Sequence, residues 1–209
     1  MPIRHSLQQY IETRILPLYD AFDRAHRRDH ALHVINRATA LAERLGADVE
    51  TAYAAAAYHD TGLAEGRELH HEASARIVRD DANLRQWFTD SQIDTIACAA
   101  EDHRASAARP PRSIYGCIVA EADRAIDPET IVRRTVQYGL ANYPGLSREE
   151  QWVRTTDHLQ KKYAEGGYLR LWLAESPNAG PLAQLRELIA DTERLRALFD
   201  SIYDNETAI

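Results

Sequence analysis

An alanine-rich segment that ends in two polar residues is the feature that most limits how this chain can fold. Residues 51–58 are mostly alanine, and His59 and Asp60 follow them directly. The segment predicts a helix, and its small side chains let neighbouring helices approach closely. This helix delivers a histidine and an aspartate into the core, where a polar pair needs a partner. We expect that partner to be a divalent metal ion.

The rest of the chain also has the hydrophobic pattern of helices. Apolar residues recur at helical spacing almost throughout, for example Val34, Ala38 and Leu41, whereas the alternating pattern of strands is scarce. The sequence therefore predicts an all-α fold. Leucines and isoleucines from Leu182 to Ile202 predict one last amphipathic helix.

Length and composition limit the organisation of the protein. The chain has 209 residues, which favours one domain overall. We expect a metal-binding helical core over residues 1–126, with the C-terminal helices of residues 127–209 packed on it. The last helix could instead form a homodimer.

Charge and hydropathy narrow the choice of partners. A net charge of −7 argues against binding to a nucleic acid polymer or a lipid surface, so an anionic substrate needs a local basic pocket. No stretch has the character of a signal peptide or the length of a membrane span. The chain has two cysteines and no Cys-x-x-Cys motif, which makes a disulfide improbable. We therefore expect a cytoplasmic protein with no membrane partner.

Two further residues complete an ordered set of possible metal ligands. His30 precedes His59 by 29 residues, and Asp123 follows Asp60 by 63 residues. His30 lies one helical turn before Val34, on the face that should point inward. Taken together, these four side chains predict a mononuclear metal site.

These motifs resemble the HD-domain superfamily of metal-dependent phosphohydrolases. The resemblance covers about residues 26–126 and depends on five segments: His30-Ala31-Leu32-His33-Val34, Ala55-Ala56-Ala57-Tyr58-His59-Asp60-Thr61-Gly62, His70-His71-Glu72-Ala73-Ser74-Ala75-Arg76-Ile77, Glu101-Asp102-His103-Arg104 and Ala122-Asp123-Arg124. It implies an HD-domain-like helical bundle with a C-terminal helical extension. It also implies that His30, His59, Asp60 and Asp123 hold a divalent metal ion, commonly Mn, Mg or Fe, or else Co or Ni.

The resemblance leaves the number of metal ions open. In binuclear relatives, later histidines bind a second ion and the aspartate of the pair bridges the two ions. His70, His71 and His103 occupy comparable places here. We expect one ion per chain rather than two.

Other polar residues near the motifs are candidates for catalysis and substrate binding. Asp60, Glu101 and His103 are the predicted catalytic residues, although Glu101 could equally form a simple salt bridge and His103 could be a core histidine. Three arginines flank the motifs and could bind a substrate phosphate: Arg67, Arg104 and Arg124.

These residues together predict a metal-dependent phosphohydrolase. Its substrate would be a small phosphorylated molecule, with a nucleotide favoured, and it would release phosphate or pyrophosphate. Two alternatives stay open: a di-iron oxygenase of the HD type and a non-catalytic regulatory module that binds nucleotides.

Overall fold

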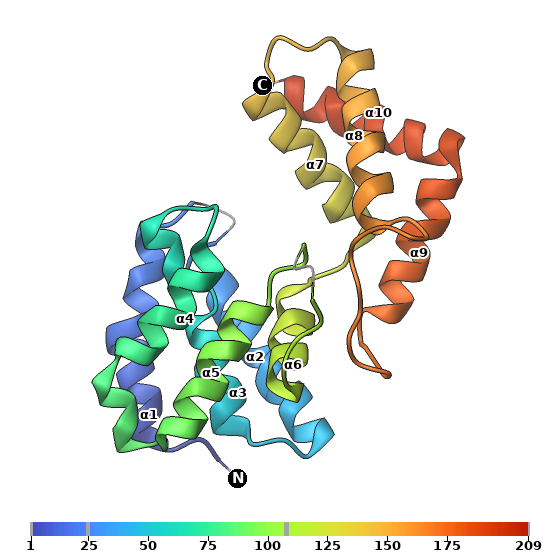
Figure 1. Ribbon diagram of the computed structural model, residues 1–209. Coiled ribbons are helices and arrows are strands. Elements are labelled where there is room, and N and C mark those ends of the chain that lie inside the picture. Colours follow the sequence, from blue (N-terminus) through green and yellow to red (C-terminus); the bar gives the residue numbers. More distant parts are fainter. Residues whose placement is uncertain (1, 24–25, 107–108, 209) are drawn as a thin grey trace. The chain divides into compact units, whose positions relative to one another are not determined.

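The chain forms helices joined by turns and loops, as the computed structural model shows (Figure 1). The structure describes residues 2–23, 26–106 and 109–208, and within these ranges no strand occurs. The predicted all-α fold is therefore confirmed. Two compact units can be distinguished, Met1–Arg124 and Ala125–Ile209.

Over its described residues, 2–23, 26–106 and 109–124, the first unit contains six α-helices and four short helical turns. In chain order these are α1 His5–Tyr10, the π-helical turn η1 Ile11–Ile15, the 3-10 turn η2 Leu16–Ala21, α2 Arg28–Leu45, α3 Val49–Tyr58, the 3-10 turn η3 Thr61–Glu65, α4 His70–Asp80, the 3-10 turn η4 Ala82–Gln86, α5 Asp90–Asp102 and α6 Ile114–Asp123.

The alanine-rich helix α3 lies at the centre of this unit. All of its residues from Thr51 to Tyr58 are buried, and it packs against α2, α5 and α6. The side chain of Asp48 accepts a hydrogen bond from the backbone N–H of Thr51 at 2.8 Å, and so it caps the start of the helix. Close packing of small side chains thus brings the end of α3 into the core.

Gly62 lets the turn after α3 lie against α4. A Cβ atom on Gly62 would lie 2.0 Å from the carbonyl oxygen of His70 and 2.5 Å from the backbone nitrogen of Ser74. The N–H of Gly62 donates a hydrogen bond to the Ser74 hydroxyl at 2.9 Å. The absence of a side chain at Gly62 therefore sets how closely the first turn of α4 approaches η3.

The second unit consists of α7 Pro128–Asn142, α8 Arg148–Tyr163, α9 Ala179–Ala190 and α10 Thr192–Thr207, which pack on one another. The prediction of one last helix is wrong, because α9 ends at Ala190 and α10 begins at Thr192. Asp191 separates them, and its carboxylate accepts a hydrogen bond from the N–H of Arg194 at 3.0 Å. The packing of the C-terminal helices on the core stays a prediction.

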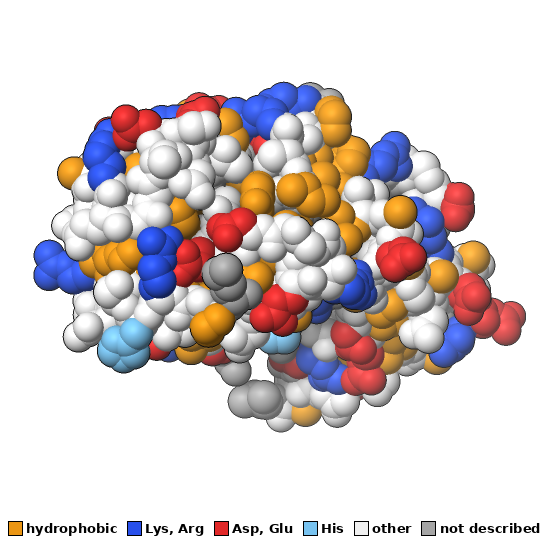
Figure 2. Space-filling model, turned by 90° about the horizontal axis from the view of Figure 1, so that it is seen from below, with side chains coloured by type: hydrophobic (Ala, Val, Ile, Leu, Met, Phe, Trp, Pro, Cys, Tyr) orange, Lys and Arg blue, Asp and Glu red, His pale blue; other side chains and the backbone are white. Residues whose placement is uncertain are grey.

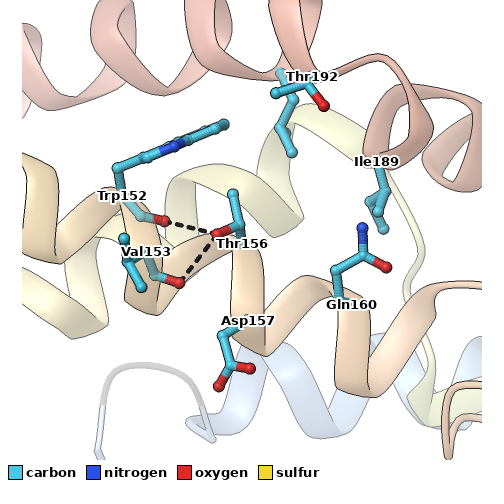
Figure 3. A pocket seen from close by; sticks show the side chains of 8 residues that line it. Trp152, Val153, Thr156, Asp157, Gln160, Ile189 and Thr192 are labelled. Atoms are coloured by element: carbon cyan, nitrogen blue, oxygen red, sulfur yellow. Dashed lines mark hydrogen bonds between the residues drawn. The ribbon is translucent and has the colours of Figure 1, made fainter.

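Helices α8, α9 and α10 line a groove of about 410 Å³ (Figure 3). Trp152 and Gln160 lie on one side of it, and Ile189 and Thr192 lie opposite. The hydroxyl of Thr156 donates to the backbone carbonyls of Trp152 and Val153. No histidine lines this groove, so the predicted metal ligands lie elsewhere.

The surface mixes charges of both signs. Figure 2 shows acidic and basic side chains interspersed with hydrophobic ones over the face that it presents. Among the described residues, no helix is both long enough and apolar enough to cross a membrane.

Candidate metal centre

The pair His59 and Asp60 lies at the buried end of α3. His59 is 0% exposed and Asp60 is 3% exposed. Nδ1 of His59 lies 2.8 Å from the carbonyl oxygen of Ala56, and Nε2 of His59 lies 3.2 Å from Oδ2 of Asp60. The end of α3 therefore directs a ring nitrogen and a carboxylate toward the same point.

Two residues from α2 and α6 join this pair on one side. Nε2 of His30 lies 3.3 Å from Nε2 of His59 and 3.7 Å from Oδ2 of Asp60. Oδ1 of Asp123 lies 3.3 Å from Nε2 of His30 and 4.0 Å from Nε2 of His59. The four residues predicted as metal ligands thus come together, and we call them the first ligand group.

Two further histidines face the other carboxylate oxygen of Asp60. Nε2 of His70, at the start of α4, lies 3.5 Å from Oδ1 of Asp60, and Nε2 of His103, just after α5, lies 3.4 Å from the same oxygen. The two Nε2 atoms are 3.2 Å apart. Asp60, His70 and His103 form the second ligand group, and Asp60 belongs to both groups.

Hydrogen bonds to the backbone assign the same tautomer to three of these histidines. Nδ1 of His59 lies 2.8 Å from the Ala56 carbonyl oxygen, Nδ1 of His103 lies 2.5 Å from that of Ala100, and Nδ1 of His70 lies 2.8 Å from that of Arg67. A carbonyl can only accept, so each Nδ1 carries a hydrogen, and each Nε2 offers a lone pair when the ring is neutral, as it must be to bind a metal ion. Nitrogen and carboxylate lone pairs that converge on a common point can bind a metal ion. A histidine that binds a metal commonly donates its other ring N–H to a carbonyl, as these three do.

Charges within the first ligand group shift the pKa values of His59, Asp60 and Asp123. Burial lowers the pKa of His59, but the carboxylates of Asp60 and Asp123 outweigh burial and raise it to about 9. Burial raises the pKa of Asp123, but the hydrogen bond with His30 and the nearby histidines lower it to about 2. Burial raises the pKa of Asp60 as well, but His59 and His103 hold it well below its ordinary value, so both carboxylates are ionised at neutral pH. Without a metal ion they favour a proton on His59, which a bound cation would displace.

The other predicted second-metal residue, His71, does not face Asp60. The Arg104 guanidinium donates to Nδ1 of His71 at 3.3 Å, so the hydrogen of the neutral ring lies on Nε2. Nε2 in turn lies 3.9 Å from a carboxylate oxygen of Glu72. His71 thus has the opposite tautomer from the three histidines above and a different partner.

Glu101 also lies outside both ligand groups. Its carboxylate pairs with Arg109 at 2.8 Å and with Arg112 at 2.9 Å. The neighbouring Asp102 binds the same two arginines and accepts a hydrogen bond from the backbone N–H of Arg112 at 2.7 Å. Both carboxylates therefore hold the segment that leads into α6. Glu101 forms the salt bridge that the sequence allowed, and its catalytic role stays a prediction.

The three arginines predicted to bind phosphate have different surroundings. Arg67 is exposed and pairs with Asp23 at 2.9 Å. Arg124 is buried beside Asp123 in sequence and lies 3.9 Å from Glu121. Arg104 follows His103 and donates to the carbonyl of Glu68 at 2.7 Å and to His71. Among the described residues, no hydrogen bond or ion pair joins the guanidinium of any of these three arginines to a residue of either ligand group.

Two residues beside the centre were not among the predicted site residues. The hydroxyl of Tyr19 donates to the Ala57 carbonyl, and the backbone N–H of Asp60 donates to that hydroxyl. Gly62 brings α4, and with it His70, toward Asp60. The motif around His59 contains Gly62 and could have indicated its role, whereas no local pattern marks Tyr19.

The order and geometry of these ligands agree with a comparison to known families. The HD domain model matches residues 27–126, which include every residue of both ligand groups. Residues 27–126 belong to the HD domain superfamily. The expected family is thus confirmed for this segment.

A solved structure shares the fold of this chain. It is a predicted HD superfamily hydrolase from an uncultured Thermotogales bacterium, with 24% sequence identity and a TM-score of 0.51. The match covers 72% of this chain and 83% of the other. At this level of identity the likeness shows the fold and does not assign an activity. No curated protein matches the chain.

The residues present fit the divalent metal ion that the superfamily implies. Imidazole nitrogens and carboxylate oxygens are the donors that Mn²⁺, Fe²⁺ and related ions accept. In each ligand group the donor atoms lie within 4.8 Å of one another, counting His30, His59 and Asp60 in the first and Asp60, His70 and His103 in the second. This HD domain therefore has a His/Asp cluster suited to a divalent metal.

Proposed function

We propose that this HD protein is a metal-dependent phosphohydrolase that acts on a small phosphorylated molecule, with a nucleotide as the favoured substrate. One observation carries the proposal: the two carboxylate oxygens of Asp60 face two separate groups of histidines. The description of the Thermotogales relative as a predicted hydrolase also supports it.

We further propose that the centre holds two ions rather than the one expected from the sequence. His30, His59, Asp60 and Asp123 would hold the first, and Asp60, His70 and His103 would hold the second. Bound divalent ions lower the pKa of a coordinated water and offset the charge of a phosphoryl group. Asp60 would bridge the ions, because its oxygens already point in two directions.

The exposure of the ligands indicates where a substrate would enter. The side chains of Asp123, His30 and His70 are 28%, 22% and 16% exposed, whereas those of His59 and His103 are 0% and 4% exposed. The centre is thus accessible to solvent beside Asp123, His30 and His70, and it is closed at His59 and His103. Substrate phosphate would approach from the open side.

Among the three arginines, Arg104 is the best placed to bind that phosphate. It contacts His71, whose ring lies edge-on to that of His70 with ring centroids 5.6 Å apart. His70 is one of the three partly exposed ligands, so a phosphate bound there would lie near the Arg104 guanidinium. Such a guanidinium can donate two parallel hydrogen bonds to a phosphate.

A panel assay tests the proposed function. The manganese-loaded protein is incubated with nucleotides and phosphate esters, and released phosphate and pyrophosphate are measured. Asp60→Ala should abolish turnover, because it removes a ligand of both ions. Asp157→Ala, which removes an exposed carboxylate paired with Lys161 in α8, is the control and should keep full activity. Full activity of Asp60→Ala, or no turnover of any compound by the native protein, would contradict the proposal.

The second ligand group also favours one other function, a di-iron oxygenase of the HD type, because that chemistry needs two bridged ions. Oxygen uptake by the iron-loaded protein, measured with an electrode, separates the two functions. A phosphohydrolase should consume no oxygen above the Asp60→Ala background.

A further inference from the structure

Tyr19 contacts the metal centre from outside the segment that matches the HD family. It lies in η2, whereas the match begins at residue 27. Its side chain is 0% exposed, and its ring stacks on that of His59 with centroids 6.2 Å apart and an angle of 30° between the planes. Phe22 packs edge-on against the ring of Tyr19. An aromatic residue of the N-terminal segment is therefore part of the surroundings of a predicted ligand.

The hydroxyl of Tyr19 bridges the end of α3 to Asp60. It donates a hydrogen bond to the Ala57 carbonyl at 2.9 Å and accepts one from the N–H of Asp60 at 3.3 Å. The last carbonyls of a helix have no partner within the helix, so an outside donor satisfies one of them here. A single hydroxyl thus ties the helix end to the residue that both ligand groups share.

The N-terminal segment that carries Tyr19 is firmly packed. Leu7, Ile11 and Leu16 are at most 1% exposed, and η2 packs against both α2 and η3. Tyr19 is therefore held at a fixed place, and it can impose that place on His59 and Asp60.

We propose that Tyr19 is a positioning residue of the metal centre. Its hydroxyl fixes the backbone of Asp60, and its ring fixes the plane of His59, so that the carboxylate presents one oxygen to each ligand group. This inference rests on the metal centre of the proposed function but not on the reaction. If Tyr19 served packing alone, only its ring would matter. A variant that lacks only the hydroxyl therefore separates a positioning role from a packing role.

Tyr19→Phe tests the inference, because it keeps the ring and removes only the hydroxyl. Metal-free protein is titrated with Mn²⁺, and free Mn²⁺ is followed by electron paramagnetic resonance without substrate. Loss of a group that orients a metal ligand typically weakens metal binding about 10- to 100-fold, and we expect a loss in that range. Circular dichroism and thermal unfolding of the metal-free variants report whether the fold is kept.

Tyr58→Phe is the matched control. Tyr58 is also buried, at the end of α3, but its hydroxyl donates to Asp81 at 2.5 Å and not to the backbone of Asp60. This variant loses a buried hydroxyl of the same kind, so we expect reduced stability and unchanged Mn²⁺ affinity.

The outcomes distinguish this inference from the proposed function. Weakened Mn²⁺ binding in Tyr19→Phe alone supports the positioning role, even if no phosphate ester is hydrolysed. Native affinity in Tyr19→Phe, an equal loss in both variants, or no Mn²⁺ binding by the native protein would overturn it.

Discussion

Replacing Gly62 with alanine should displace the second ligand group, and the structure gives the size of this displacement. The added Cβ would lie 2.0 Å from the carbonyl oxygen of His70, whereas ordinary contact begins at 3.4 Å. The Cβ would thus lie about 1.4 Å too close to the oxygen (3.4 − 2.0 Å). The atoms that it meets belong to the backbone, which cannot rotate away as a side chain can. The first turn of α4 must therefore move relative to η3, and it carries His70 away from Asp60.

Two magnitudes follow from this displacement. Metal–ligand distances hold within about 0.2 Å, so a shift several times larger should remove His70 from coordination and weaken the second ion strongly. Overpacking a close backbone contact typically costs about 1–3 kcal/mol in the free energy of unfolding, and we expect a loss in this range.

The assay measures both quantities on the same protein. Urea denaturation of the metal-free variant gives the free energy of unfolding, and elemental analysis after loading and desalting gives the metal content. Gly180→Ala is the control, because nothing lies within 4 Å of a Cβ there and the residue belongs to α9. A Gly62→Ala protein with native stability and native metal content would refute the reasoning.

Two further predictions concern single side chains. His70→Gln should lose the second metal ion and His71→Gln should keep it, because His70 faces Asp60 and His71 does not. Elemental analysis measures the metal content of both variants, and equal content in the two would contradict the assignment. Burial raises the pKa of Asp81, but hydroxyl donors from Tyr10 and Tyr58 outweigh it and hold the pKa below the ordinary 3.8. The ionised carboxylate therefore stabilises the fold fully above pH 3.8, and this stabilisation is lost as the pH falls below that value. In Asp81→Asn, the free energy of unfolding should depend less on pH in the acid range. Urea denaturation at several pH values measures this dependence. A variant whose stability falls as steeply with acid as that of the native protein would count against this role.

The fold class follows closely from the local sequence pattern, whereas the first ligand group was predicted from the order of its four residues and from the family resemblance. The helical spacing of apolar residues, the cap at Asp48 and the placing of His30 one turn before Val34 all act within a turn or two of chain. Interactions of such short range leave a readable local pattern. Local signals also have limits: the leucines of α9 and α10 continue the helical spacing past Asp191 and hide the break there.

The sequence by itself determined that the protein is helical and that His30, His59, Asp60 and Asp123 can meet. The tertiary structure alone decided that His70 and not His71 faces Asp60, since neighbouring residues on a helix point about 100° apart. It also placed Tyr19 against a residue 41 positions later in the chain. The physical reason is that such contacts depend on the distance and angle at which helices pack, which arise from side chains far apart in sequence and from no single segment.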